Sequence, residues 1–253
     1  MKALIFAAGL GTRLRPFTLE HPKALVPLAG IPMLERVIRK VIDAGITDIV
    51  VNVHHFASQI VDFLNDKDNF GADIHISDES RLLLDTGGGL LNARRWLQGD
   101  DPILIHNADI LTDFPIAEMA EAHRRAKALA TLLVDKRGSS RQLLFNNGRM
   151  LCGWENLKTG EVLPPQLAQH AGAIPDSVLP LAFGGVHIVS PEIFPLLTSY
   201  HSPGTPFPIV PFYVSICGHC QLLGYTPSQP YMWHDIGRPE SLSAATASIT
   251  GAS

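Results

Sequence analysis

The sequence predicts an α/β protein with a mostly parallel mixed sheet flanked by helices. Short apolar runs such as residues 3–7 and 48–53 have the length of buried strands. Between these two runs, residues 32–44 carry apolar side chains at helical spacing, and Gly45 ends the pattern. Because strand and helix patterns alternate in this way through the first half, the sheet should be parallel there, with helices on both faces.

The remaining elements follow from the same patterns. Further strands are expected at residues 73–77, 102–107, 130–134, 149–155 and 182–189. Further helices are expected at residues 57–64, about 90–97, 117–128 and 191–197, with a Pro-rich turn at 203–208. Ligands in such sheets bind beyond the carboxyl ends of the strands. The loops after Ala7, Ser77 and Asn107 should therefore line one cleft.

Composition excludes several classes of protein. The chain has 253 residues, a formal net charge of -4 and a sequence pI near 6.2, so it lacks the basic footprint of a nucleic-acid-binding protein. No run reaches the roughly 18 apolar residues of a membrane span. The three cysteines are an odd number, which argues against a secreted disulfide framework and predicts a cytoplasmic protein.

A glycine-rich turn follows the first strand. Residues 7–13 read Ala-Ala-Gly-Leu-Gly-Thr-Arg, and glycines let main-chain N–H groups approach phosphate oxygens closely. Thr12 can add a hydroxyl donor, and Arg13 adds a planar fork suited to phosphate. No Gly-Lys-Ser/Thr follows, so this is not a Walker loop, and Leu14 stands where a dinucleotide fingerprint needs a third glycine. Taken alone, the pattern fits a purely structural turn equally well.

Three charged side chains suit phosphate chemistry. Lys23 lies between Pro22 and Pro27, which should hold an extended segment and fix its ammonium as a point charge for a triphosphate. A solvated surface lysine is the alternative. Asp109 follows an apolar strand, and Asp235 lies in a Trp-His-Asp-Ile-Gly segment, so each could offer oxygen ligands to Mg²⁺ or merely cap a turn.

Together these segments resemble the sugar nucleotidyltransferase family, whose signature is Gly-x-Gly-Thr-Arg-Leu-x-Pro followed by Pro-Lys-x-x-x-Pro. The match runs nearly residue for residue over residues 7–27. The resemblance implies the nucleotide-diphospho-sugar transferase fold and the joining of a nucleoside triphosphate to a sugar 1-phosphate, with release of pyrophosphate. It makes Arg13 and Lys23 the catalytic residues. It assigns nucleotide binding to Ala7, Ala8, Gly9, Gly11 and Thr12 and, through a glycine-rich loop at residues 85–89, to Thr86, Gly87 and Gly88.

The resemblance also implies a metal site and a sugar site. In the family, aspartates of Gly-Asp and Trp-x-Asp-Val/Ile-Gly-x-Pro-Glu motifs hold magnesium, which makes Asp109 and Asp235 the Mg²⁺ ligands here. The sugar site is assigned to Asn107, Glu155 and Gly185. The family's Glu-Lys pair reads Glu155-Asn156 in this chain, so the lysine that binds the sugar phosphate is replaced. Lys158 and Arg141 are candidates to take its role.

The chain resembles the compact members of the family that make UDP-N-acetylmuramate or related UDP-sugars. We therefore expect UTP and an N-acetylated amino-sugar 1-phosphate as substrates. A mannose-1-phosphate guanylyltransferase and a choline phosphate cytidylyltransferase of the same fold are the alternatives. Two other classes stay open: a catalytically silent nucleotide-sugar sensor, and a nicotinamide-dependent oxidoreductase, against which the missing third glycine argues. The protein should be a monomer or small homo-oligomer that binds neither nucleic acid nor membranes.

No long polar linker divides the sequence, so residues 1–253 should form a single Rossmann-like domain. We expect a nucleotide-binding part at residues 1–135 and a sugar-phosphate-binding part at 136–253, with an insertion or lid at 157–180, which is rich in Pro, Gly and Gln. Residues 217–220 read Cys-Gly-His-Cys, a dithiol redox motif. That chemistry requires the first cysteine at a helix N-terminus, whereas here a helical pattern precedes it, so we expect a structural turn.

Overall fold

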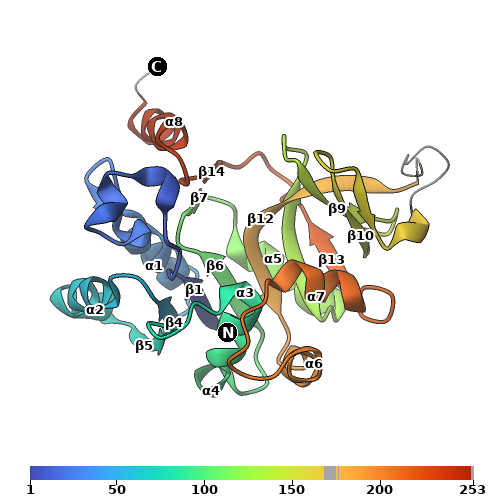
Figure 1. Ribbon diagram of the computed structural model, residues 1–253, viewed down its shortest axis with the longest axis horizontal. Helices are drawn as coiled ribbons and strands as arrows, with labels where there is room; N and C mark the ends of the chain where they lie inside the picture. The colour runs from blue at the N-terminus through green and yellow to red at the C-terminus, as the bar shows by residue number, and fades with distance from the viewer. Residues whose placement is uncertain (168–174, 176, 252–253) are drawn as a thin grey trace.

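The computed structural model describes residues 1–167, 175 and 177–251, and its centre is one large mixed sheet (Figure 1). In the described residues this sheet has ten strands, in the order β11-β10-β9-β12-β6-β1-β4-β5, with β8 pairing β12 and β13. The strands are β1 (Lys2–Phe6), β4 (Asp48–Val53), β5 (Asp73–Asp78), β6 (Ile103–Asn107), β8 (Ala130–Asp135), β9 (Arg141–Phe145), β10 (Leu151–Asn156), β11 (Glu161–Leu163), β12 (Leu179–Val189) and β13 (Leu222–Tyr225). Two small sheets pair β7 (Ile110–Thr112) with β14 (Trp233–Asp235), and β2 (Pro27–Leu28) with β3 (Ile31–Pro32).

Helices cover both faces of the sheet. They are α1 (Met33–Asp43), α2 (Ala57–Asp66), α3 (Asp85–Asn92), α4 (Arg94–Leu97), α5 (Ile116–Ala126), α6 (Ile193–Tyr200), α7 (Ile209–Ile216) and α8 (Pro239–Thr250). One core packs α1, α2 and α5 against the sheet, and the other packs α3, α4, α6 and α7 against it. Strands β5, β4, β1 and β6 are mutually parallel. The inner three, β4, β1 and β6, are largely buried, which explains their nearly continuous apolar sequences, whereas the edge strand β5 is only partly buried. The predicted fold class is confirmed.

Strand β12 joins the two halves of the chain. Over Val186–Val189 it pairs antiparallel with β6, and over Leu179–Leu181 it pairs with β9. A register shift against β8, between Phe183 and His187, marks the bend between these two regions. The sheet therefore continues from the first half of the sequence into the second (Figure 1).

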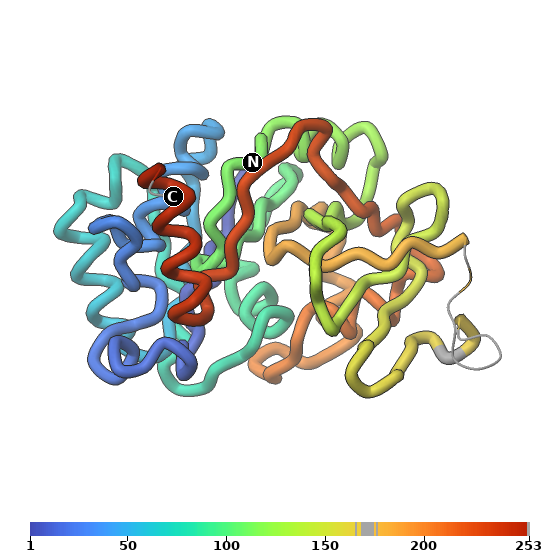
Figure 2. Tube along the Cα trace, turned by 90° about the horizontal axis from the view of Figure 1, so that it is seen from above, coloured from blue at the N-terminus to red at the C-terminus, as the bar shows by residue number. Residues whose placement is uncertain are grey.

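The end of the chain returns to the first half. Strand β14 pairs with β7, and α8 then lies beside the N-terminal loops (Figure 1 and Figure 2). The two ends of the chain share a third core cluster, in which Leu14, Val26 and Met33 from the start of the chain are buried together with Ile236 and Ala245. None of the helices in the described ranges is long and apolar enough to cross a membrane.

Several expected elements differ from the structure. The helix expected at about 90–97 is two helices, and the first begins at Asp85, so the glycine-rich loop expected at 85–89 is already helical. The segment around Lys23 is a 3-10 helix (Lys23–Leu25) and not an extended stretch, because Pro22 starts the turn. Of the insertion expected at 157–180, the structure gives β11 and a 3-10 helix (Pro165–Leu167), and β12 already begins at Leu179; residues 168–174 and 176 lie outside the described residues.

Candidate active site

A cavity of about 440 Å³ opens at the carboxyl ends of β1, β4, β5 and β6. The loops after Ala7, Ser77 and Asn107 all contribute to its lining, as expected from the position of the strand ends. Its lining residues are Phe6, Ala7, Ala8, Gly9, Lys23, Ala24, Asn52, Glu79, Leu83, Asp85, Thr86, Asn107, Ala108, Asp109 and Pro206.

The glycine-rich turn forms one wall of this cavity. Gly11 adopts a left-handed conformation (φ 62°), which favours glycine, and its carbonyl accepts a hydrogen bond from the Thr18 hydroxyl at 2.8 Å. A Cβ atom on Gly11 would lie 2.8 Å from the Cβ atom of Lys23, so this position also requires glycine for close packing. Thr12 and Arg13 follow in an exposed 3-10 helix (Thr12–Leu14). The turn and the lysine are therefore packed as one unit.

A buried polar network lies under the same turn. The Ala7 amide donates to Asn52 Oδ1 at 2.7 Å, and Asn52 Nδ2 donates to Glu79 Oε1 at 2.9 Å. The other carboxylate oxygen of Glu79 accepts from the Leu84 amide at 3.0 Å. Asn52 and Glu79 are only 2% and 3% exposed. The Ala7 amide is thus bonded to Asn52, which anchors the start of the glycine-rich turn.

Neither network residue was predicted from the sequence. Asn52 is a polar residue near the end of an otherwise apolar strand, and Glu79 directly follows the next strand, so their positions were the only signal. Burial raises the pKa of Glu79, and its hydrogen bonds from the Leu84 amide and Asn52 oppose this shift. The network connects the glycine-rich turn to the loop that leads into α3.

Lys23 forms an ion pair with Asp109 across the cavity. Their side chains are 12% and 25% exposed, so Lys23 is not a solvated surface lysine. The 3-10 helix that starts at Lys23 and the end of β6 bring the two charges together, although they are 86 residues apart in the sequence. The structure thereby places the two predicted residues in one site.

The pairing of β7 with β14 brings Asp235 beside Asp109. Asp235 lies opposite Ile110, and the Ile236 amide donates to the Asp109 carbonyl at 2.8 Å. Burial, and next the negative charge of Asp109, raise the pKa of Asp235, while Lys23 and Arg13 oppose the shift. Asp235 Oδ1 is buried and has no hydrogen-bond partner among the residues that the structure describes. An unpartnered carboxylate oxygen beside a second carboxylate fits the oxygen-donor set of a hard divalent cation.

The two aspartates are a pair and not part of a larger cluster of potential metal ligands in the described residues. Within the described part of the chain, no group of three or more His, Cys, Asp or Glu side chains is placed to hold a metal ion. Mg²⁺ is commonly bound by one or two carboxylates, with substrate phosphates and water completing its coordination. Asp109 and Asp235 match that arrangement.

The side chain of Arg13 extends from the glycine-rich turn to the neighbourhood of Asp235. A Cβ atom on Gly237 would lie 2.7 Å from Asp235 Oδ1 and 2.8 Å from Arg13 Nη2. The ends of both side chains therefore rest against Gly237. Arg13, Lys23, Asp109 and Asp235, which come from four separate segments, converge on one region.

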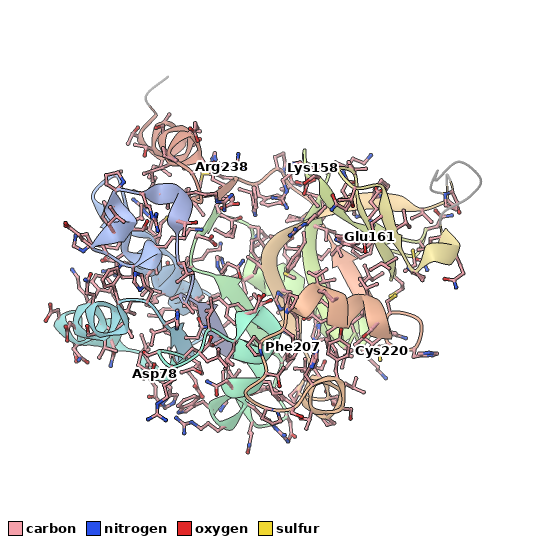
Figure 3. The ribbon with its side chains drawn as sticks, in the orientation of Figure 1. Asp78, Lys158, Glu161, Phe207, Cys220 and Arg238 are labelled. Atoms are coloured by element: carbon pink, nitrogen blue, oxygen red, sulfur yellow. The ribbon has the colours of Figure 1, made fainter. Side chains whose placement is uncertain are left out.

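The three predicted nucleotide-binding residues of α3 have different environments. Thr86 lines the cavity, and its hydroxyl oxygen accepts from the Ile209 amide at 2.9 Å. Gly87 and Gly88 do not line it; their amides donate to the Phe207 carbonyl at 2.9 and 3.2 Å. A Cβ atom on Gly87 would lie 2.2 Å from the Phe207 ring, which sits beside α3 (Figure 3). These two glycines allow close packing of the helix and the segment before α7.

The predicted sugar residues lie toward the second half of the chain. Asn107 lines the cavity. Gly185 has a left-handed conformation (φ 72°) and lies against the Asn107 side chain, since a Cβ atom added to Gly185 would lie 3.0 Å from Asn107 Nδ2. Glu155 is 8% exposed on β10 and is not among the cavity-lining residues; burial raises its pKa. A second cavity of about 600 Å³ is lined by Arg141 and Asn156, which are directly opposite each other on β9 and β10.

Comparison with known proteins agrees with this geometry. Residues 2–142 match the nucleotidyl transferase family. The chain belongs to that family. This match confirms the resemblance inferred from residues 7–27 and the prediction that the protein is an enzyme, a nucleotidyltransferase. It rules out the nicotinamide-dependent oxidoreductase.

Two relatives of this nucleotidyltransferase differ in how much of the chain they match. An N-acetylmuramate alpha-1-phosphate uridylyltransferase from Caulobacter vibrioides is 31% identical over 254 residues, covering 99% of this chain and 97% of that protein. A mannose-1-phosphate guanyltransferase from Gibberella zeae is 40% identical over 138 residues, which are 54% of this chain and 38% of that protein.

Solved structures share the fold at low sequence identity. A putative glucose-1-phosphate thymidylyltransferase from Bacillus anthracis superposes with a TM-score of 0.79 at 20% identity, covering 98% of this chain and 94% of that one. A UDP-glucose pyrophosphorylase in complex with UDP-glucose gives a TM-score of 0.75 at 18% identity, covering 99% and 98%. The nucleotide-diphospho-sugar transferase fold is confirmed by these neighbours.

The Cys-Gly-His-Cys segment of this nucleotidyltransferase is a turn, as expected. Cys217 is the C-cap residue of α7, where the helix ends, and not at a helix N-terminus. Cys152, Cys217 and Cys220 are all free thiols. Burial raises the pKa of Cys217, which makes it a poorer nucleophile and excludes the environment of a redox dithiol.

Proposed function

We propose that this nucleotidyltransferase transfers UMP from UTP to an N-acetylated amino-sugar 1-phosphate and releases pyrophosphate. The observation that carries the proposal is the extent of the match to the uridylyltransferase, which covers nearly the full length of both chains. The guanyltransferase matches only 54% of this chain and 38% of its own length. A site built from residues along the whole chain should therefore be shared with the uridylyltransferase rather than with the guanyltransferase.

In the proposed reaction, an oxygen of the sugar 1-phosphate attacks the α-phosphorus of the nucleotide in line. A new bond forms between this oxygen and the α-phosphorus, and the bond from the α-phosphorus to the bridging oxygen of the pyrophosphate breaks. The attacking phosphate is already ionised, so no protein nucleophile is needed. The work of the protein is positioning and charge neutralisation.

The cations of the site fit these roles. Lys23 and Arg13 would neutralise charge on the triphosphate and on the departing pyrophosphate, with the amides of Gly9, Gly11 and Thr12 as further donors. Ala7, Ala8 and Thr86 would line the nucleotide site, while Gly87 and Gly88 keep α3 close enough to form its wall. Asn107, Glu155 and Gly185 would serve the sugar.

Asp109 and Asp235 would hold a Mg²⁺ ion in this enzyme. When bound, such an ion neutralises phosphate charge and orients the reacting oxygens. The unpartnered oxygen of Asp235 and its raised pKa support this assignment, because a cation would relieve the repulsion between the two carboxylates. The single domain would divide functionally into a nucleotide-binding part (1–135) and a sugar-phosphate-binding part (136–253). Three free thiols fit a cytoplasmic location.

A mannose-1-phosphate guanylyltransferase is the second candidate, because identity to the guanyltransferase reaches 40% over 138 residues. A silent nucleotide-sugar sensor fits less well, since Arg13, Lys23, Asp109 and Asp235 converge in one site. The test is incubation of the protein with each NTP, Mg²⁺ and a panel of sugar 1-phosphates, scored by pyrophosphate release. Release with UTP and N-acetylmuramate or N-acetylglucosamine 1-phosphate is expected. Turnover restricted to GTP and mannose 1-phosphate would replace the proposal, and no turnover with any pair would favour the sensor.

A further inference from the structure

Arg137 lies in an unusual setting beside the active site. Its guanidinium carbon is 3.4 Å from the centroid of the Trp233 ring, which is a close stacking contact. Its Nη2 donates to the Ala182 carbonyl at 3.1 Å, while its Nε is buried with no hydrogen-bond partner among the described residues. A guanidinium has five N–H donors in a fixed fork, and leaving one buried and unpaired is costly. The described part of the chain therefore leaves this guanidinium with unused hydrogen-bonding capacity.

The stacking partner connects Arg137 to the candidate metal ligands. Trp233 and Asp235 are two residues apart on β14, so their side chains project from the same face of that strand. Arg137, stacked on Trp233, therefore lies on the face from which Asp235 projects. Asp235 Oδ1 is itself buried and unpartnered. Two unsatisfied groups of opposite charge thus border the same region.

The bend of β12 connects Arg137 to the sugar-side residues. The Trp233 indole N–H donates to the Gly184 carbonyl at 2.9 Å, and Ala182, two residues earlier, accepts from Arg137. Gly185, which follows Gly184, lies against Asn107, and Asn107 lines the nucleotide cavity. A continuous set of contacts thus leads from the guanidinium to the rim of that cavity.

The local charges keep Arg137 available as a cation. Burial lowers the pKa of Arg137, and Tyr231, Asp135 and Asp235 oppose the shift. A guanidinium stays protonated at neutral pH under such conditions. Water around it is depleted, which strengthens its attraction for an anion.

Three other cations, Lys23, Arg141 and Lys158, are less well placed for this role. Lys23 is paired with Asp109 and faces the nucleotide cavity. Arg141 lines the separate cavity beside α7, and Lys158 is exposed in the turn after β10 (Figure 3). Asn156, opposite Arg141, carries no charge. Among the described residues, Arg137 has a guanidinium that is held in place by Trp233 and Ala182, and its Nε has no hydrogen-bond partner. It lies on the face of β14 from which Asp235 projects, on the side where the sugar 1-phosphate would bind.

We propose that Arg137 binds the phosphate of the sugar 1-phosphate and so takes the role of the acceptor-side cation in this chain. The inference rests on the proposed function, because it requires a sugar 1-phosphate as the second substrate. Trp233 would act as a positioning residue that holds the guanidinium plane toward this phosphate.

The test compares Arg137→Ala and Arg137→Lys with Lys136→Ala, which removes the exposed neighbouring cation. For Arg137→Ala we expect the KM for the sugar 1-phosphate to rise about 10- to 100-fold, the magnitude of a lost charge-assisted contact, with the KM for the NTP unchanged within about twofold. Arg137→Lys should recover part of the loss, since it keeps the charge but not the fork. Lys136→Ala should resemble the wild type. A purely structural role would instead lower the melting temperature and raise both KM values together.

Titration calorimetry separates this inference from the proposed function. N-acetylmuramate 1-phosphate and mannose 1-phosphate are titrated into the wild type and Arg137→Ala in the presence of Mg²⁺ and a non-hydrolysable NTP. If the sugar 1-phosphate binds more weakly to Arg137→Ala than to the wild type, the result supports Arg137 as the residue that binds its phosphate, even if no turnover is observed. Equal affinity for both proteins, no binding to the wild type, or a loss seen in Arg141→Ala or Lys158→Ala instead, overturns it. Absence of turnover in the wild type bears on the proposed function and leaves this binding comparison to decide on Arg137.

Discussion

Replacing Asn52 with leucine should destabilise the protein through the network under the glycine-rich turn. Leucine has a similar size and shape but neither donates nor accepts a hydrogen bond. Asn52 is 2% exposed, so water cannot replace the partners that it leaves behind. The Ala7 amide would lose its acceptor at 2.7 Å, and Glu79 would lose one of its two donors.

The expected size of the effect follows from these two losses. An unsatisfied buried amide costs about 1–3 kcal/mol, and a lost hydrogen bond to a charged group costs about 1.5–3 kcal/mol. The sum predicts a decrease of roughly 2.5–6 kcal/mol in the free energy of unfolding, which is large against the usual effect of a point mutation. The turn that carries Gly9 and Gly11 should also lose its anchor, so the KM for the NTP should rise.

Urea unfolding followed by circular dichroism measures the stability change. Asn65→Leu, at an exposed position on α2, is the matched control and should change the free energy of unfolding by less than about 0.5 kcal/mol. Combining Asn52→Leu with Glu79→Gln should cost less than the sum of the two single changes, by about 1 kcal/mol, because the residues interact directly. If Asn52→Leu is as stable as the control variant, the reasoning about this network is refuted.

Three further predictions follow from the site and the core. Gly237→Ala should leave stability within about 1 kcal/mol of the wild type but lower kcat by about 10- to 100-fold, because the new methyl group displaces the flexible ends of Arg13 and Asp235; an unchanged kcat would contradict this contact. Lys23→Met should lower kcat about 100-fold or more in steady-state assays, and activity near that of the wild type would remove Lys23 from the reaction. His123 is buried with both ring nitrogens hydrogen-bonded, and burial lowers its pKa to about 4. His123 in the unfolded chain takes up a proton near pH 6.5, whereas in the folded chain it does not, so the free energy of unfolding should fall as the pH drops from 6.5 toward 4. In urea titrations, His123 should account for about 2 kcal/mol of the decrease between pH 7 and pH 5. The variant His123→Gln should show a weaker pH dependence.

The sequence predicted best the elements whose patterns are local. The first strand, α1 and the strand at 48–53 were found because their apolar residues alone encode burial on one or both faces. α3 was misjudged because three consecutive glycines normally disfavour a helix. Its glycines are needed for contacts with Phe207 and Glu79, which only the tertiary structure reveals.

The site residues that could be predicted from the sequence are those that belong to short motifs. Lys23 and Asp109 were each identified from their own segments, but their ion pair depends on packing between residues far apart in the sequence. Asn52 and Arg137 could not be assigned a role from the sequence, since a single polar residue in or near an apolar strand is compatible with many environments. The pairing of β14 with β7, which brings Asp235 to Asp109, could not be inferred from either three-residue strand alone.

The central claim, that Asp109 and Asp235 form the metal-dependent centre of a nucleotidyltransferase, is tested most directly with Asp109→Asn. The measurement is the rate of pyrophosphate release at saturating substrates over a range of Mg²⁺ concentrations, beside Asp62→Asn at an exposed site on α2 as the control. The change keeps the size of the side chain and removes one charge from the metal site. We expect turnover at least about 100-fold below that of the control, with an unchanged melting temperature. Turnover and Mg²⁺ dependence equal to those of the control would contradict the claim.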